Sequence, residues 1–160
     1  MGALNGRVAV ITGAGKMKFR HVIHAVGPKM GEGDEDRKLS AAVRSSLALA
    51  DRHGLKSVAI PAISTGNYGF PVERCARILL TEVHRYLQGG TKLQRVIVCL
   101  FDEATWKLFA REPARFNPRR FCLNIPRVAA SSRTSRKRRT PGPERFSCWR
   151  TKVPFGLASR

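Results

Sequence analysis

A short apolar run that leads through a glycine-punctuated loop into a helical pattern most constrains what this chain can fold into. Residues 57–70 read SVAIPAISTGNYGF, and an amphipathic pattern begins at Pro71. A strand, loop and helix in this order bring loop amides and a helix N-terminus to one spot, which suits a bound anion. Gly66 and Gly69 let backbone N–H groups approach an oxyanion closely. We therefore expect a phosphate-binding loop at the centre of the sequence.

Strand and helix patterns alternate along the chain. Strands are predicted at 7–12, 20–26, 56–61 and 94–101, and helices at 34–53, 71–87 and from Asp102 onward. Helices that alternate with continuous apolar strands predict an α/β fold with a largely parallel sheet. Ligands of such sheets lie beyond the carboxyl ends of the strands, where the loop at 64–70 and Phe101 both fall.

Basic charge is unevenly distributed along the chain. The formal net charge is +19, from 30 Lys and Arg against 11 Asp and Glu. Residues 1–112 hold 17 basic and 10 acidic residues (+7), whereas residues 113–160 hold 13 and 1 (+12). We therefore predict a folded domain over 1–112 and a basic, disordered tail over 113–160. Such a tail can bind nucleic acid weakly and without sequence specificity, although a solvated extension is the simpler interpretation.

Neither a membrane segment nor a metal centre is predicted. No apolar run is long enough to span a bilayer and the N-terminus lacks a signal-peptide pattern, so we expect a cytoplasmic protein, or a nuclear one in a eukaryote. The cysteines, at positions 75, 99, 122 and 148, lack the clustering of metal ligands. We expect no cofactor, and local sequence suggests no Ser/His/Asp or Cys/His catalytic arrangement.

The N-terminal sequence offers a competing interpretation, which we reject. Residues 5–15, NGRVAVITGAG, resemble the opening of short-chain dehydrogenases. A dinucleotide fingerprint needs a further glycine at the start of a helix, whereas residues 16–20 lead into another strand pattern. The chain also lacks a Tyr-x-x-x-Lys motif that could supply the catalytic pair of that family.

Segments in a fixed order resemble a second family, the macro domain, which is an ADP-ribose-binding module. They are HVIHAVGP at 21–28, the helical pattern from Arg37, SVAIPAISTGNYGFP at 57–71 and VIVCLFD at 96–102. The resemblance extends over residues 6–112 and covers about the C-terminal two thirds of the module. It implies a three-layer α/β/α fold with a mixed, largely parallel sheet that is incomplete at the N-terminus.

The same resemblance implies a binding site for ADP-ribose or an ADP-ribosylated protein. The loop at 64–69 would wrap the diphosphate with backbone amides, Phe70 would pack beside the distal ribose, and Phe101 would lie against the adenine. Considered without the resemblance, these residues could form a tight turn, a helix staple and a core strand end. The site implied consists of Ser64, Thr65, Gly66, Asn67, Tyr68, Gly69, Phe70 and Phe101.

An earlier segment of the family has no counterpart in this sequence. It carries an acidic residue that recognises the adenine amino group and a loop on which catalysis partly depends, so catalytic residues stay unknown and enzymatic activity stays open. The alternatives to binding are an ADP-ribosyl hydrolase or O-acetyl-ADP-ribose deacetylase, and a truncated product that binds nucleic acid through its tail. Loss of early strands would expose an apolar sheet edge, so we expect marginal stability or self-association.

Overall fold

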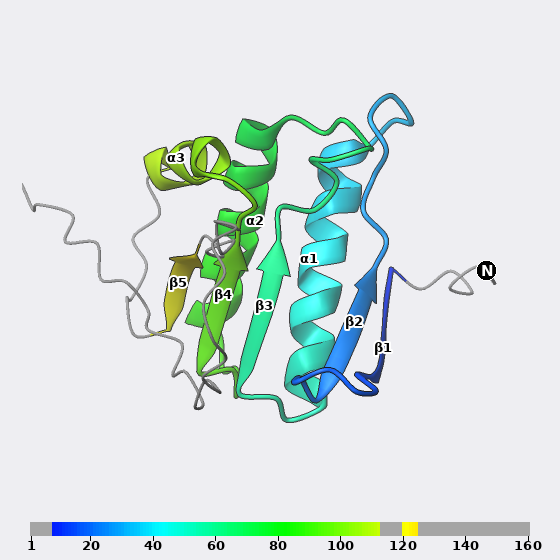
Figure 1. The fold of residues 1–160 in the computed structure, drawn as a ribbon, viewed down its shortest axis with the longest axis vertical. Helices are drawn as coiled ribbons and strands as arrows, with labels where there is room; N and C mark the ends of the chain where they lie inside the picture. The colour runs from blue at the N-terminus through cyan, green and yellow to red at the C-terminus, as the bar shows by residue number, and fades with distance from the viewer. Residues whose placement is uncertain (1–7, 113–119, 125–160) are drawn as a thin grey trace, which may run out of the picture. The chain divides into compact units, whose positions relative to one another are not determined.

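The computed structural model describes residues 8–112 and 120–124 (Figure 1). The strands are β1 (Ala9–Gly13), β2 (His21–Ala25), β3 (Ser57–Pro61), β4 (Arg95–Cys99) and β5 (Phe121–Asn124). The helices are α1 (Glu35–Arg52), α2 (Val72–Gln88) and α3 (Glu103–Arg111). Every strand and helix that the sequence predicts is present with small shifts at its ends, so the α/β alternation is confirmed.

The strands form two sheets within the described residues. β1 and β2 make an antiparallel hairpin in which Ala9 faces Ala25 and Gly13 faces His21. β3, β4 and β5 make a parallel sheet with β4 in the middle. No ladder joins β2 to β3 in this part of the chain, although both strands contact α1. The mixed, largely parallel strand arrangement is confirmed, and self-association through an open edge stays a prediction.

α1 forms because apolar and small residues recur along it at helical spacing. Glu35 and Asp36 occupy its first turn and Arg52 its last, which suits the helix dipole at both ends. Gly54, with φ +65°, follows the helix and takes the left-handed conformation that glycine adopts at low cost. The buried face consists of Leu39, Ala42, Val43, Ser46, Leu47 and Ala50.

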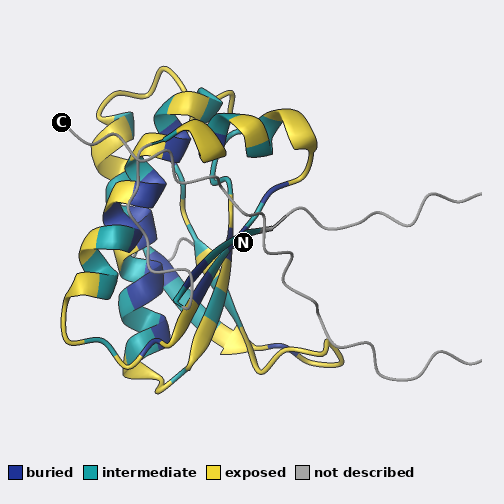
Figure 2. Cartoon of the chain, turned by 90° about the vertical axis from the view of Figure 1, so that its left-hand side faces the viewer, coloured by how far each residue is buried: buried dark blue, intermediate teal, exposed yellow. Residues whose placement is uncertain are grey.

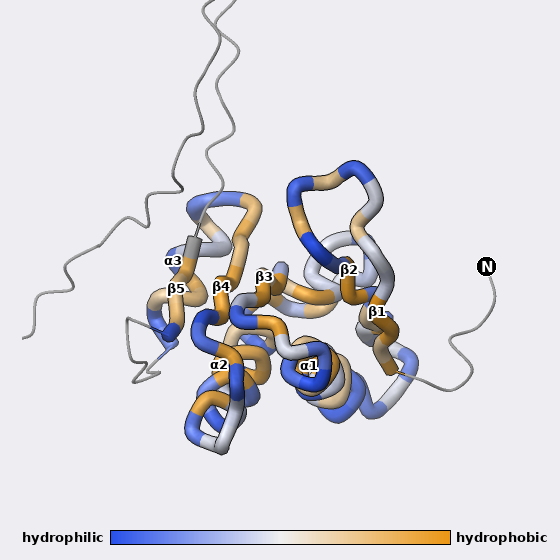
Figure 3. Tube along the Cα trace, turned by 90° about the horizontal axis from the view of Figure 1, so that it is seen from below, coloured by the Kyte–Doolittle hydropathy of each residue, from blue (hydrophilic) through white to orange (hydrophobic). Residues whose placement is uncertain are grey.

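The core lies between the two long helices and the parallel sheet. α1 and α2 lie side by side on one face of the strands (Figures 1 and 3). Figure 2 shows buried residues on the side of the helices that faces the sheet and exposed residues on the opposite side. The strands and α3 add Ile60, Val96, Val98, Phe109 and Phe121 to this cluster.

The face of β3 that points away from the helices is open. Val58 and Ile60 turn inward, whereas Ser57, Ala59 and Pro61 are exposed. α3 packs against α2 and β5 rather than over this face. The described residues therefore show one helical layer over β3, and the second layer of a three-layer fold is not among them.

β5 lies beyond the predicted domain boundary. The sequence places a disordered tail from residue 113, but Phe121–Asn124 form a strand in which Phe121 pairs with Val96. The Arg120 guanidinium fixes its start by donating to the carbonyl oxygens of Leu87 (2.9 Å) and Leu93 (2.8 Å). The prediction of disorder is therefore wrong for this strand, because pairing with a distant strand overrides weak local pattern. The rest of the predicted tail lies outside the described residues.

Candidate anion-binding site

The loop after β3 folds back on itself through local hydrogen bonds. The N–H of Gly69 donates to the carbonyl of Gly66 at 2.9 Å, and that of Phe70 to Ser64 at 3.0 Å. The Thr65 hydroxyl donates to the carbonyl of Ala62 at 2.9 Å. Ser64 (φ +65°) and Gly69 (φ +67°) adopt the left-handed conformation, which is uncommon for a serine. These bonds fix a compact turn between β3 and α2.

The middle of this loop carries backbone donors that the fold leaves unused. Within the described residues, the N–H groups of Gly66, Asn67 and Tyr68 donate no hydrogen bond. All three residues are exposed, and an added Cβ at Gly66 would meet no heavy atom within 4 Å. α2 begins at Val72 directly after the loop, so the positive end of its dipole lies nearby in sequence. Unused N–H donors beside a helix N-terminus can hold an oxyanion.

A second loop, between β2 and α1, closes against the first. The N–H of Met30 donates to the carbonyl of Tyr68 at 3.0 Å. An added Cβ at Gly27 would overlap Ser64 Oγ and lie 2.5 Å from Ile63 Cγ2, so the backbones approach closely there. Ser64 Oγ is buried and has no hydrogen-bond partner among the described residues, which is a costly arrangement for a hydroxyl.

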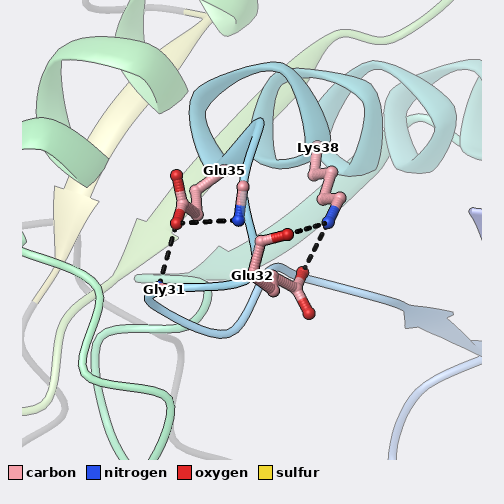
Figure 4. A network of polar contacts seen from close by, with 5 residues as sticks. Gly31, Glu32, Glu35 and Lys38 are labelled. Atoms are coloured by element: carbon pink, nitrogen blue, oxygen red, sulfur yellow. Dashed lines mark hydrogen bonds and ion pairs between the residues drawn. The ribbon is translucent and has the colours of Figure 1, made fainter.

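The β2–α1 loop is held in shape by Glu35 and Lys38 (Figure 4). Glu35 Oε1 accepts from the N–H groups of Gly31 (2.9 Å) and Gly33 (3.2 Å). Hydrogen bonds from its own backbone N–H and from those two glycines lower the pKa of Glu35. Lys38 Nζ lies 3.2 Å from Glu32 Oε1. Sequence analysis missed this network, because the acidic residues also suit an ordinary helix start.

The aromatic residues of the predicted site divide into a buried and an exposed group. Phe70 is 1% exposed and belongs to the core, with the Arg74 guanidinium carbon 5.1 Å from its ring centroid. Phe101, two residues after the end of β4, is 84% exposed, so the alternative that it is a core residue is wrong. Tyr68 is 51% exposed. Figure 1 places the loops after β2, β3 and β4 at the same end of the strands.

Cys75 is the thiol nearest the loop in sequence, and it is poorly suited to be a nucleophile. Its Sγ–H donates to the carbonyl of Ile63 at 3.4 Å, and burial raises the pKa of the thiol to about 12. The prediction that Cys75 is buried is confirmed. The thiol therefore stays protonated and acts as a packing group and a weak donor to the loop.

Other histidines and acidic residues gather into no further centre in the described part of the chain. His24 Nε2 lies 2.9 Å from Thr12 Oγ1, and the rings of His21 and His53 are 5.9 Å apart. Across residues 8–112 and 120–124, no group of three or more His, Cys, Asp or Glu could hold a metal ion. In the same ranges no helix is both long and apolar enough to cross a membrane.

The sequence is similar to proteins of one family. The family model of the Macro domain matches residues 3–79. A macro domain-containing protein of Caldanaerobacter subterraneus subsp. tengcongensis is 49% identical over 105 residues, which cover 64% of this chain and 59% of that protein. O-acetyl-ADP-ribose deacetylase 1 of Pantoea vagans is 43% identical over 105 residues, which cover 64% of this chain and 61% of that protein. The chain thus spans less than two thirds of either relative.

Solved structures show a similar fold. The Oceanobacillus iheyensis macrodomain with ADP superposes with a TM-score of 0.60 at 30% identity, covering 64% of this chain and 54% of that one. The Trypanosoma brucei macrodomain in complex with ADP-ribose gives a TM-score of 0.52 at 35% identity, covering 56% of this chain and 38% of that one. Both identities are high enough that the likeness concerns sequence as well as fold.

Proposed function

From the match of residues 3–79 to the macro domain family model, we propose that the chain is a macro domain protein that binds ADP-ribose, free or attached to a protein, through its loop at 64–70. The observation that carries the proposal is the set of unused N–H donors on Gly66, Asn67 and Tyr68, just ahead of α2. A diphosphate needs several such donors at once. The solved relatives named with ADP and ADP-ribose support the same class of ligand.

The parts of the ligand are assigned to different residues. The diphosphate lies on the loop formed by Ser64, Thr65, Gly66, Asn67, Tyr68 and Gly69. The exposed ring of Phe101 offers a face for the adenine, and such stacking adds to simple burial. Phe70 borders the distal ribose, while its buried ring anchors the loop to the core.

Hydrolysis of an ADP-ribose ester is the second candidate function. It is favoured by the names of two Pantoea vagans relatives, O-acetyl-ADP-ribose deacetylase 1 and 2. We assign no catalytic residue to it, because Cys75, the thiol nearest the loop in sequence, stays protonated. Steady release of acetate from O-acetyl-ADP-ribose by the purified chain would support this candidate over binding alone.

Calorimetric titration of the full chain with ADP-ribose at moderate salt tests the binding proposal, with ADP and NAD as comparison ligands. Gly66→Glu places a carboxylate among the proposed donors, and an added Cβ there meets nothing within 4 Å, so the fold should persist. Gly90→Glu is the matched control, because its site is equally open and it follows α2 at the other end of that helix.

We expect saturable one-site binding that Gly66→Glu abolishes and Gly90→Glu leaves unchanged. The new carboxylate repels the negatively charged diphosphate in a site built of backbone N–H dipoles, which accounts for the loss of binding. Absence of binding by a folded chain, or equal binding by both variants, would overturn the proposal.

A further inference from the structure

The end of the fold opposite the 62–70 loop combines exposed cations with exposed apolar side chains. The β1–β2 connection contains Lys16, Met17, Lys18, Phe19 and Arg20 in succession, and all five residues are exposed. Phe19 is 67% exposed and Met17 54%. Figure 1 shows this connection at the lower end of the strands, away from the loop that follows β3. Two large apolar side chains are thus exposed in alternation with three cations.

Other elements bring cations to the same end. Arg52 lies in the last turn of α1, Lys56 directly precedes β3, and Arg95 begins β4. The His21 and His53 rings, whose centroids are 5.9 Å apart and whose planes are tilted by 52°, bring the start of β2 close to the end of α1. The carbonyl of Lys56 accepts the N–H of Arg95 at 3.0 Å. We define the basic end as Lys16, Lys18, Arg20, Arg52, Lys56 and Arg95.

The cations of the basic end are uncompensated. All six belong to exposed residues, and none forms an ion pair within the described part of the chain. The nearby Asp51 is already engaged by the N–H of Lys92 at 2.8 Å and the Tyr86 hydroxyl at 3.2 Å.

Acidic residues gather instead where helices begin. Those positions are Glu32, Asp34, Glu35, Asp36, Glu73, Asp102 and Glu103. Two cations close to them are paired, Lys38 with Glu32 and Arg74 with Asp36. Acidic residues are therefore concentrated where helices begin, whereas the opposite end of the strands carries six exposed cations without ion pairs among the described residues.

We propose that the basic end binds single-stranded nucleic acid. Its cations neutralise successive phosphates, and the ring of Phe19 stacks on a base that a single strand leaves accessible. The cations come from the β1–β2 connection, the end of α1, the residue before β3 and the start of β4, which suits an extended polyanion. A membrane contact of the usual amphipathic kind buries a broader apolar face than Met17 and Phe19 provide. This site is separate from the proposed ADP-ribose site.

Fluorescence anisotropy of the full chain with a labelled oligouridylate tests the proposal across a range of salt concentrations. The hairpin variant carries Lys16→Gln, Lys18→Gln and Arg20→Gln together. The control variant carries Arg37→Gln, Arg77→Gln and Arg111→Gln, which remove the same charge from exposed residues without ion pairs within the described residues. Both variants keep the segment at 113–160, so its contribution cancels in the comparison.

We expect the hairpin variant to lose affinity and to flatten the plot of log K against log salt by about 2, from three lost phosphate contacts at about 0.7 each. The control variant should keep a slope close to that of the unaltered chain. Phe19→Ala should weaken binding about tenfold without changing the slope, because stacking is not ionic.

Equal losses in the hairpin and control variants would overturn the proposal in favour of net charge alone. Binding to vesicles of phosphatidylcholine and phosphatidylserine that the hairpin variant loses, with oligouridylate binding unchanged, would assign the end to membranes instead. If the hairpin variant fails to fold, ultraviolet crosslinking of the unaltered chain to the oligouridylate tests the proposal instead. Crosslinks within 14–20 support the site, and crosslinks confined to 113–160 contradict it.

Discussion

The parallel sheet and the β1–β2 hairpin differ greatly in how many side chains they contribute to the hydrophobic core. β3, β4 and β5 supply Ile60, Val96, Val98 and Phe121 to the buried cluster that α1 and α2 complete. Among the described residues, the hairpin reaches that cluster only through Ile23, which is partly buried. Both sheets have regular ladders, so their difference lies in apolar burial rather than in backbone hydrogen bonding. A two-stranded ribbon alone is marginal in water, so the hairpin depends on α1.

The candidate site lies where these two regions meet. The loop at 64–70 is attached to the region of the parallel sheet, because Phe70 and Cys75 belong to the buried cluster there. The loop after β2 continues from the hairpin, which has less buried core. It contacts the loop at 64–70 through the Met30–Tyr68 hydrogen bond and the close approach of Gly27 to Ser64. Ligand affinity should therefore respond to changes in the hairpin that barely alter global stability.

The largest expected effect is the difference in stability loss between truncating a side chain of the parallel-sheet region and truncating one of the hairpin. Leu79 of α2 is fully buried in the cluster, whereas Ile11 of β1 is only partly buried. Leu79→Ala should lower the free energy of unfolding by about 3 kcal/mol, and Ile11→Ala by about 1 kcal/mol, because the cavity cost grows with burial. Urea unfolding measures both. Equal losses would show that the hairpin is as well supported as the parallel sheet.

Gly27→Ala should strain the contact between the two loops. The new Cβ overlaps Ser64 Oγ, and overpacking of this kind costs about 2 kcal/mol. We expect weaker ADP-ribose binding together with a lower melting temperature. Gly13→Ala, on the hairpin itself, is the control, because an added Cβ there meets nothing within 4 Å. Unchanged ADP-ribose affinity in Gly27→Ala would show that the contact between the two loops does not contribute to binding.

Glu35→Gln should have a smaller, pH-dependent effect on the loop after β2. The pKa of Glu35 is lowered from 4.5 in the folded chain, so its stabilising contribution is present above that pH and is lost as the pH falls through the folded value. The variant should melt below the unaltered chain at neutral pH and converge with it in acid. Glu73→Gln, at an exposed residue without an ion pair among the described residues, is the control. A pH-independent difference would contradict this account.

Chemical labelling of the native Cys75 thiol should report how readily the region of the parallel sheet opens, and it needs no substitution that would change stability. Burial raises the pKa of its thiol to about 12, so little thiolate exists at neutral pH. We expect iodoacetamide to leave Cys75 unmodified in the native chain and to modify it in urea, as mapped by mass spectrometry. Cys99, which is less buried, provides the internal comparison. Native labelling of Cys75 as fast as Cys99 would show that this region opens readily.

Local pattern was enough to predict α1, α2 and the strand that precedes the 62–70 loop. Their apolar spacing is long or regular, and propensity agrees with the tertiary setting. Pattern could not separate the two sheets, because which strands pair depends on contacts between distant residues. β5 was missed for the same reason, since its four residues gain their conformation from β4. The exposure of Phe101 and the unused loop amides likewise appear only once the chain is folded.

The central claim is that the loop at 64–70 holds the diphosphate, and amide chemical shifts during titration of the full chain with ADP-ribose test it most directly. The account predicts large, saturable shifts at Gly66, Asn67 and Tyr68, with the hairpin amides from Lys16 to Arg20 unmoved. A folded chain whose 64–70 amides stay in place while others shift would contradict it.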